Sequence, residues 1–349
     1  MTLTQRALGL TCAAAALLAT GTAPAPVLAQ DAPVIALSNS FYGNTWRRQM
    51  VDAFTEQAEA AKAEGLISDF VVLNGDGSVA QQNSQLAELI LRGVDAIAIN
   101  AASETALNDI VTRACDAGIT VVAFDSLLSA ECAWKLGFDF TNYKTEQAEA
   151  TLELIGNEGN VIVVRGVSGS APDAQMYAAQ KAVLDANPNV TVVAEVIGEA
   201  TASVAQQAIA NILPSLPQVD AVLAQGGSDD FGIARAFEQY GGPYAEKMPV
   251  IEGGGSSDFV IWWNQLTQTQ PDYRTTSMNT TPGIGGAAFW YALDISQGAN
   301  PPKHINMPVA VVEAETLAEF AEGLEPGFII SPSYSHEWVT ENLTNATGG

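Results

Sequence analysis

The sequence predicts an α/β protein of two similar lobes, each built on a doubly wound parallel sheet. Short apolar runs of strand length alternate with segments of helical periodicity along most of the chain. This pattern runs to about residue 125 and restarts near Asn160. At 349 residues, the chain is also longer than a single domain usually is.

The first half of the chain predicts alternating strands and helices. Its apolar runs predict strands at Val34–Leu37, Phe70–Leu73, Asp95–Ile99 and Ile119–Phe124. Helices are predicted over Trp46–Glu64, through Gln85–Ile90, and from Glu104 to Gly118. In the first of them apolar residues recur at helical spacing, at Met50, Phe54, Ala58 and Ala61.

The second half repeats this order. Strands are predicted at Asn160–Val164, Val190–Ile197, Ala221–Ala224 and Val250–Ile251, with helices between them and one following Pro172. Trp262 and Trp263 are neighbours in a helical segment, and adjacent helical side chains point in different directions. We therefore expect one of them in the core and the other partly exposed.

Composition excludes some partners. The chain carries 14 Lys and Arg against 39 Asp and Glu, a formal net charge of −25. Phosphate backbones and anionic lipid surfaces need basic patches, so neither nucleic acid nor such a membrane is expected as a partner.

Residues 1–29 have the pattern of a secretory signal peptide. Arg6 precedes the apolar run Ala7–Ala19, and the small-residue site Val27–Ala29 fits cleavage near Ala29. The apolar run is shorter than the ~20 residues that a membrane span needs. We therefore expect export to the periplasm.

Two cysteines, Cys115 and Cys132, remain after this cleavage. In an oxidising compartment an even pair favours a disulfide, which would close a loop around Asp125; two buried thiols are the alternative. The two histidines, His304 and His336, are isolated in sequence, so no metal site, catalytic cysteine or cofactor is predicted.

Polar residues cluster where the predicted strands end. Parallel sheets bind ligands at the carboxyl ends of their strands, so these residues are candidates for a ligand site. They are Asn39 and Ser40, Asn100, Asp125 and Ser126, Arg165, Gly226 to Asp229, and Glu252.

Such residues suit a sugar or polyol. Each buried hydroxyl needs a hydrogen-bond partner, and Asp125 and Glu252 can each accept two. Trp46 and Tyr42 offer flat apolar faces to C–H surfaces, although Trp46 could equally pack at a helix start.

Three second-lobe residues have two interpretations each. Arg165 could contact ligand or form a structural ion pair. Asp173 and Gln175 stand at the start of a helix, where helix capping competes with ligand contact.

Several motifs together resemble the periplasmic sugar-binding proteins of ABC importers, in the branch of the ribose-binding protein. The resemblance covers roughly Pro33 to Val312. The segments that show it are Ile35–Leu37 with the loop Ser40–Trp46, Leu91–Ile97 with Asn100, Ala117–Asp125, and Ala224–Ala236.

The resemblance implies two lobes joined by three crossings, near Phe138–Asp139, Asn279–Thr280 and Ala310–Val312. The first lobe would comprise residues 30–139 and 281–312. The second would comprise residues 140–280 and 313–349.

The family's ligand contacts carry over in part. The resemblance matches Ser40 and Asn44 to polar contacts, Trp46 to an aromatic against the sugar, Asp125 to a hydroxyl acceptor, and Asn279 to a glutamine. Ser126 replaces an arginine, a second arginine is missing around Ala174–Met176, and Gly226 and Gly253–Gly254 replace an asparagine and a Phe-Asp pair. These departures argue against ribose.

The full set of candidate ligand contacts is Ser40, Tyr42, Asn44, Trp46, Asp125, Ser126, Arg165, Asp173, Gln175, Asp229, Glu252 and Asn279. The resemblance implies a monomeric, non-enzymatic carrier that delivers a sugar or polyol to a membrane permease. Two alternatives stay open. One is a partner of a chemoreceptor or sensor kinase, and the other is a secreted carbohydrate enzyme using paired carboxylates such as Asp125 and Glu252.

Overall fold

The structure is a computed structural model, and it describes residues 32–346. The predicted signal peptide and its cleavage site lie outside the described residues. Within residues 32–346 no helix is long and apolar enough to cross a membrane.

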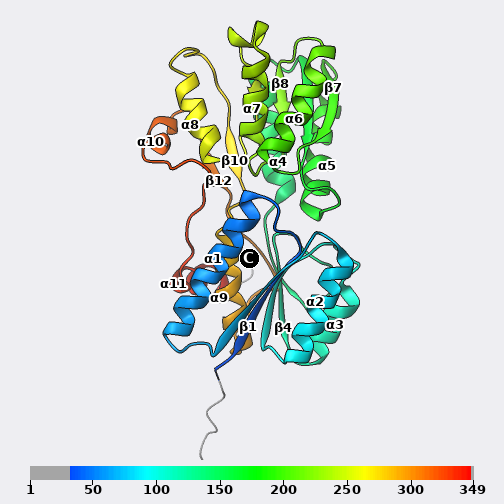
Figure 1. The fold of residues 1–349 in the computed structure, drawn as a ribbon, viewed down its shortest axis with the longest axis vertical. Coiled ribbons are helices and arrows are strands. Elements are labelled where there is room, and N and C mark those ends of the chain that lie inside the picture. The colour runs from blue at the N-terminus through cyan, green and yellow to red at the C-terminus, as the bar shows by residue number, and fades with distance from the viewer. Residues whose placement is uncertain (1–31, 347–349) are drawn as a thin grey trace, which may run out of the picture. The chain divides into compact units, whose positions relative to one another are not determined.

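The first lobe is built on a parallel sheet with the strand order β11-β5-β4-β3-β1-β2. Its strands are β1 (Val34–Asn39), β2 (Asp69–Asn74), β3 (Ala96–Asn100), β4 (Thr120–Phe124), β5 (Trp134–Gly137) and β11 (His304–Asn306). Its helices are α1 (Thr45–Ala63), α2 (Val79–Arg92), α3 (Asn108–Asp116) and α9 (Ile284–Ser296). Figure 1 shows α1 and α9 on one side of this sheet and α2 and α3 on the other.

Both faces of this sheet are buried, which explains its continuous apolar strands. In β4, Val122 and Phe124 join the core under α1 and α9, whereas Val121 and Ala123 join the core under α2 and α3. This division follows from the alternation of side chains along a strand.

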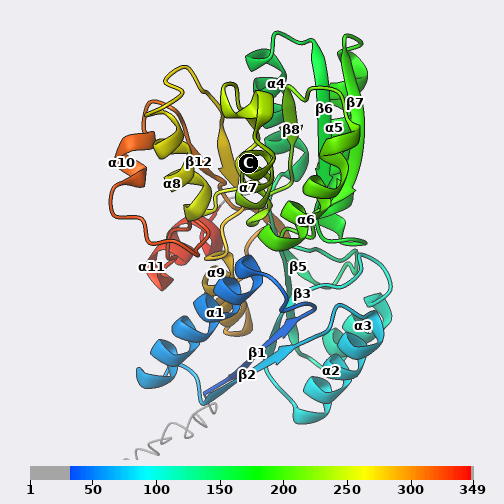
Figure 2. The ribbon, with the colours of Figure 1, turned by 45° about the horizontal axis from the view of Figure 1, so that its top comes forward.

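The second lobe has a parallel sheet with the order β7-β6-β8-β9. Its strands are β6 (Gly159–Arg165), β7 (Val190–Ile197), β8 (Ala221–Leu223) and β9 (Val250–Ile251), and Figure 2 shows β6, β7 and β8 side by side. Its longer helices are α4 (Phe140–Leu154), α5 (Ala171–Ala186), α6 (Ala202–Ile212), α7 (Asp229–Tyr240) and α8 (Ser257–Leu266). Short helical turns η1 (Leu213–Ser215) and η2 (Gly242–Ala245) complete it.

The predicted fold class is therefore confirmed, and the predicted strands match closely. Helix α3 is shorter than predicted, because residues 101–107 form a bend and a turn before its first residue, Asn108. Trp262 and Trp263 differ from prediction as well, since both are buried in the same core, at 5% and 0% exposure. Trp262 packs against Phe259 and Tyr273, so the helix is covered on more than one face.

Three segments run between the two sheets near the predicted crossings, which stay a prediction. The chain passes from β5 into α4 at Asp139, whose side chain caps α4. The other two crossings are β10 (Ser277–Asn279) and β12 (Ala310–Val312), which pair as an antiparallel two-stranded sheet.

The C-terminal segment divides between the lobes instead of joining only the second. Helix α10 (Leu317–Ala321) packs with α8, but α11 (His336–Val339) and the π-helical turn η3 (Thr340–Thr344) pack on α9. His336 stacks on Trp290 and bonds Asp294 at 2.7 Å. The predicted domain boundaries stay a prediction, and we propose that residues 331–346 belong with the first lobe.

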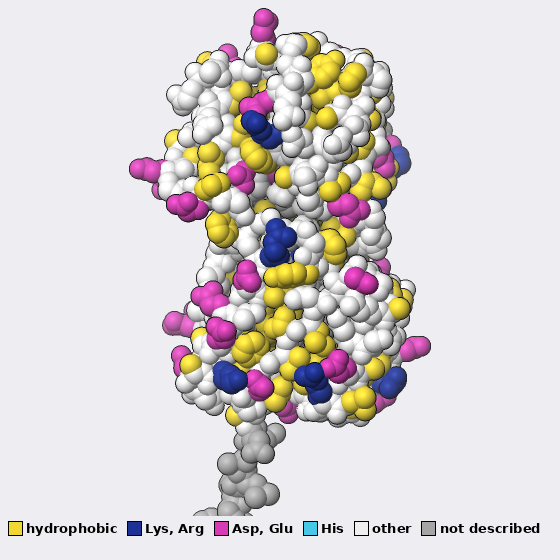
Figure 3. Space-filling view, in the orientation of Figure 1, with side chains coloured by type: hydrophobic (Ala, Val, Ile, Leu, Met, Phe, Trp, Pro, Cys, Tyr) yellow, Lys and Arg dark blue, Asp and Glu magenta, His cyan; other side chains and the backbone are white. Residues whose placement is uncertain are grey.

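Acidic side chains are spread over both lobes on the face drawn in Figure 3. They do not gather into one patch there. This distribution agrees with a solvated acidic surface.

Cys115 and Cys132 form a disulfide, as predicted, with their Cα atoms 6.4 Å apart. The bond joins α3 to the loop before β5 and closes a segment of sequence separation 17 that contains β4. Both cysteines pack beside the core under α2 and α3.

Reducing this disulfide should lower the stability of the protein by about 3 kcal/mol, because the reduced unfolded chain regains loop entropy. The measurement is urea unfolding with and without reductant. A Cys115→Ala/Cys132→Ala double variant is the control, and it should not respond to reductant. Equal midpoints for oxidised and reduced wild-type protein would contradict the prediction.

Candidate functional site

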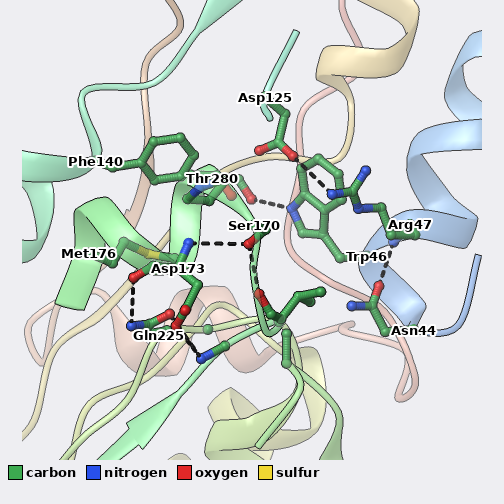
Figure 4. A pocket seen from close by; sticks show the side chains of 16 residues that line it. Asn44, Trp46, Arg47, Asp125, Phe140, Ser170, Asp173, Met176, Gln225 and Thr280 are labelled. Carbon is green, nitrogen blue, oxygen red and sulfur yellow. Dashed lines mark hydrogen bonds and ion pairs between the residues drawn. The ribbon is translucent and has the colours of Figure 1, made fainter. Parts of the chain in front are cut away.

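A pocket lies between the carboxyl ends of the strands of both sheets. It has about 510 Å³ of space free of protein atoms, part of it open to solvent. The first lobe and the crossing after β10 line it with Asn44, Trp46, Arg47, Asp125 and Thr280. The second lobe lines it with Phe140, Gly166, Val167, Ser170, Pro172, Asp173, Met176, Ala200, Gln225, Gly226 and Gly227. Figure 4 shows the labelled side chains of this pocket.

The start of α1 positions three of these residues. Asn44 is the N-cap of the helix, and its Oδ1 accepts a hydrogen bond from the backbone N–H of Arg47 at 2.9 Å. Trp46 donates from Nε1 to the carbonyl of Thr280 at 2.8 Å, which ties the first lobe to a crossing. The indole N–H therefore already has a hydrogen-bond acceptor, and the apolar ring lines the pocket.

Arg47 and Asp125 form a buried ion pair beside Trp46. Arg47 Nη2 lies 3.6 Å from Asp125 Oδ2, and both side chains are 7% exposed. Arg47 Nη1 also donates to Asn39 Oδ1 at 3.3 Å, and Asn100 Nδ2 donates to Asp125 Oδ2 at 3.0 Å. Burial raises the pKa of Asp125, while the Arg47 charge and the Asn100 bond oppose that rise.

The backbone of Asp125 is strained. Its φ is 55°, in the left-handed region that residues with a side chain rarely adopt. Strain of this kind, held at a pocket wall directly after β4, is a feature that functional sites often retain.

The second-lobe wall is organised by Asp173. Its carboxylate accepts two bonds from Arg165, at 2.9 and 2.6 Å, and a third from the backbone N–H of Gly166 at 3.2 Å. Gln225 Oε1 accepts from the same Gly166 N–H at 2.9 Å, and Gln225 Nε2 donates to the Asp173 carbonyl at 3.2 Å. Arg165 also stacks over Tyr177, with its guanidinium carbon 3.8 Å from the ring centroid.

Behind this wall lies a fully buried charged cluster, defined here as Lys144, Asp229, Asp230 and Glu252. Lys144 Nζ donates to the Ala224 carbonyl at 2.7 Å and lies 3.5 Å from Glu252 Oε2. Asp229 accepts from the backbone N–H groups of Gln225 and Gly226. Burial and the neighbouring Asp230 charge raise the pKa of Asp229 to about 8.

Of the predicted contacts, Asn44, Trp46, Asp125 and Asp173 line the pocket. Ser40 lines an adjoining hollow, which shares Arg47, Val167 and Ser170 with the pocket. Arg165 does not line the pocket but pairs with Asp173, which does. Its contacts therefore agree with a structural ion pair, the second of its two predicted roles.

The structure does not bring the other six predicted contacts to the pocket wall. Tyr42 and Gln175 point to solvent, with Tyr42 39% exposed. Ser126 donates to the Ala101 carbonyl, and Asn279 donates to the carbonyls of Thr280 and Ile330. Asp229 and Glu252 lie in the buried cluster at 0% exposure. Asp229 and Glu252 lie close to strand ends, as expected, but their side chains turn away from the pocket. There Asp229 accepts backbone N–H groups and Glu252 pairs with Lys144.

Sequence reasoning missed Arg47, Gln225, Met176 and Phe140. Arg47 directly follows Trp46, a predicted contact, and lies three residues after Asn44, another one. The first turn of a helix brings residues three apart to the same side. Gln225 directly follows a predicted strand, which was a usable signal. Met176 and Phe140 are apolar residues in helices and carried no such signal.

Within the described residues, no group of three or more His, Cys, Asp or Glu side chains could hold a metal ion. The side chains that line the pocket offer hydrogen-bonding groups and apolar faces. A concave site with a few convergent polar groups, placed between two parallel-sheet lobes, defines a two-lobed solute-binding protein.

Comparison with known proteins supports this class and gives the family. The family model described as "Periplasmic binding protein domain" matches residues 35–300. A solved ABC transporter solute binding protein from Thermobispora bispora is 38% identical, covers 89% of this chain and 94% of its own, and superposes with a TM-score of 0.82. The chain belongs to the periplasmic binding protein family.

Two curated relatives match over shorter stretches. A xylitol-binding protein of Mycolicibacterium smegmatis is 25% identical over 200 residues, which is 57% of this chain and 56% of that protein. A D-xylose-binding periplasmic protein of Escherichia coli is 30% identical over 106 residues, which is 30% of this chain and 32% of that protein. The chain thus aligns with about half of the first relative and a third of the second.

The raised pKa of Asp229 predicts a pH-dependent stability. Between the ordinary value of 3.8 and about 8, the folded protein keeps a proton that the unfolded chain releases. The stability contributed by this group is fully present below pH 3.8 and is lost as the pH rises through about 8.

Asp229→Asn should therefore gain stability relative to wild type between pH 5 and pH 9, on the order of a few kcal/mol, since one pKa unit equals about 1.4 kcal/mol. Urea unfolding of both proteins across this range measures the difference. Asp116→Asn, at an exposed position on α3, is the control and should show no such trend. A pH-independent difference for Asp229→Asn would contradict the prediction.

Proposed function

We propose that this protein is the solute-binding component of an ABC importer, that its ligand is a neutral sugar or polyol, and that it delivers this ligand to a membrane permease. The observation that carries the proposal is the pocket between the two lobes. It combines Asn44, Arg47 and Asp125, which can donate and accept hydrogen bonds, with the apolar faces of Trp46 and Phe140.

The charge balance supports a neutral ligand. Arg47 is balanced by Asp125 across 3.6 Å, and Arg165 is balanced by Asp173 across 2.6 Å. An anionic ligand would have to compete with a buried carboxylate for each cation. The names of the two curated relatives, which state xylitol and D-xylose binding, agree with this ligand class.

We further propose that the protein is exported, monomeric and not an enzyme. Glycoside hydrolysis needs two carboxyl groups facing one substrate. Glu252, the partner considered for Asp125, is fully buried against Lys144, and both oxygens of Asp173 accept bonds from Arg165. Presentation of a ligand to a chemoreceptor or sensor kinase stays an alternative use of the same pocket.

A thermal-shift screen against sugars and polyols, including xylitol and D-xylose, tests ligand binding. A true ligand should raise the melting temperature in a concentration-dependent way, because it binds only the folded state. Conversion of any sugar to product during incubation would instead favour the enzyme.

Asp125→Asn should weaken binding of the best ligand by about 10- to 100-fold, because a lost acceptor leaves sugar hydroxyls without a partner. Asn44→Asp keeps an oxygen to cap α1 but replaces the side-chain donor, so it should also weaken binding while preserving the fold. Calorimetric titration gives the affinities, with Asp116→Asn as the matched control. Wild-type affinity in both variants would place the ligand elsewhere.

Ligand binding should also close the lobes, because residues on both walls can contact one ligand only when the lobes approach. Small-angle scattering should then give a smaller radius of gyration with the best ligand of the screen than without it. A sugar that produces no thermal shift is the control. An unchanged scattering curve at saturation would contradict closure.

A further inference from the structure

The chain passes between the lobes once more after β12. It leaves α10, which packs with α8 in the second lobe, and reaches α11, which packs on α9 in the first lobe. Figure 1 shows this part of the chain running from α10 to α11. The C-terminal strap, residues 327–334, lies between these two helices.

The strap is bonded to the second lobe on either side of Ile329. The backbone N–H of Ser257 donates to the Phe328 carbonyl at 2.8 Å, and the backbone N–H of Ile330 donates to the Gly255 carbonyl at 2.8 Å. Gly255 and Ser257 flank the N-cap of α8. These two bonds therefore fix the strap to the start of a second-lobe helix.

Ile329 itself is bonded to the first lobe through Gln49. Its backbone N–H donates to Gln49 Oε1 at 2.6 Å, and its carbonyl accepts from Gln49 Nε2 at 3.1 Å. Ile329 is 2% exposed, so water has little access to compete for these groups. Gln49 lies in α1 shortly after Trp46 and Arg47, which line the pocket. The Gln49–Ile329 bond pair is therefore close in the chain to two residues of the pocket wall.

Neighbouring residues of the strap are thus bonded to opposite lobes. Consecutive Cα atoms are about 3.8 Å apart, so the start of α1 can move relative to the start of α8 only within the reach of the Gln49 side chain, unless the bond pair breaks. Within residues 32–346, no ion pair joins one lobe to the other. The Gln49–Ile329 bond pair therefore restrains the lobes where no charge pair does so.

We propose that Gln49 is a positioning residue for ligand binding. By bonding Ile329, it narrows the range of lobe arrangements that the ligand-free protein adopts, and it keeps the first turn of α1 facing the second-lobe wall. The inference rests on the proposed function, because a ligand of this pocket must meet both walls at once. The apparent Kd equals the intrinsic Kd divided by the fraction of molecules in a binding-competent arrangement, so a narrower range that includes this arrangement tightens binding.

Gln49→Ala removes the bond pair, and Gln57→Ala is the matched control. Gln57 lies later on the same helix and is likewise half-buried, but its Oε1 accepts from Trp290 Nε1 at 2.8 Å within the first lobe. Both variants lose a side-chain amide with bonded partners, so both should lower the melting temperature. Only Gln49→Ala should change how the lobes move.

Spin labels on the two lobes measure that motion without any ligand. Glu59 on α1 and Glu319 on α10 are exposed positions for the labels, and the two native cysteines are joined in a disulfide. Gln49→Ala should broaden the distribution of inter-label distances and shift its mean by more than about 2 Å, as a change in lobe arrangement does. Gln57→Ala should give the wild-type distribution. A wild-type distribution in Gln49→Ala, or equal broadening in both variants, would overturn the proposal.

Calorimetric titration with xylitol and D-xylose then measures the effect on binding. Gln49→Ala should raise the apparent Kd about three- to tenfold, because the binding-competent fraction falls when the bond pair is lost. Gln57→Ala should keep the wild-type Kd. Gln49→Glu keeps an oxygen that accepts from the Ile329 N–H but loses the Nε2 donor, so its Kd and its distance distribution should lie between those of wild type and Gln49→Ala.

The two measurements separate this inference from the proposed function. An unchanged Kd in Gln49→Ala, beside a broadened distance distribution, would overturn the positioning role and leave the proposed function standing. If neither probe binds the wild-type protein, the proposed function fails for these ligands. The label distances, measured without ligand, would still decide whether Gln49 restrains the lobes.

Discussion

The second-lobe half of the pocket depends on one buried cation, Lys144, which has 0% exposure. A buried ammonium needs opposite charge and acceptors, and it finds them in the Ala224 carbonyl, Gln147 and Glu252. These groups come from α4 and from the ends of β8 and β9, so satisfying one charge fixes two strand ends. Asp229 then holds the N–H groups of Gln225 and Gly226, and thereby fixes the loop that lines the pocket.

The first-lobe half depends on a second buried charge, Arg47. Its partner Asp125 is delivered by the end of β4 in a left-handed backbone conformation, and Asn39 and Asn100 end the neighbouring strands β1 and β3. The pair balances charge but leaves donors for a ligand. In each lobe, therefore, a buried charge and its partners hold the strand ends that form the pocket.

A C-terminal strap, residues 327–334, connects the lobes in addition to the three crossings. Phe328 and Ile330 bond the second-lobe segment Gly255–Ser257 through the backbone. Between them, Ile329 bonds both ends of the Gln49 amide on α1. Because neighbouring residues of the strap hold opposite lobes, any hinge motion must act on these bonds as well as on β10 and β12.

The sequence by itself determined the two α/β lobes, eight of the twelve strands in residues 32–346 and the strand ends where the pocket lies, and it favoured the disulfide over two free thiols. Periodicity and chain order are local signals, and parallel sheets place their binding residues at one edge. Only the tertiary structure decided which strand-end side chains face the pocket. Glu252 and Asp229 turn inward because buried Lys144 and backbone N–H groups require them, and Arg47 and Gln225 reach the wall instead. Which side chains face the pocket depends on residues far apart in sequence. Every buried charge and N–H group needs a hydrogen-bond or charge partner, and these partners come from different elements.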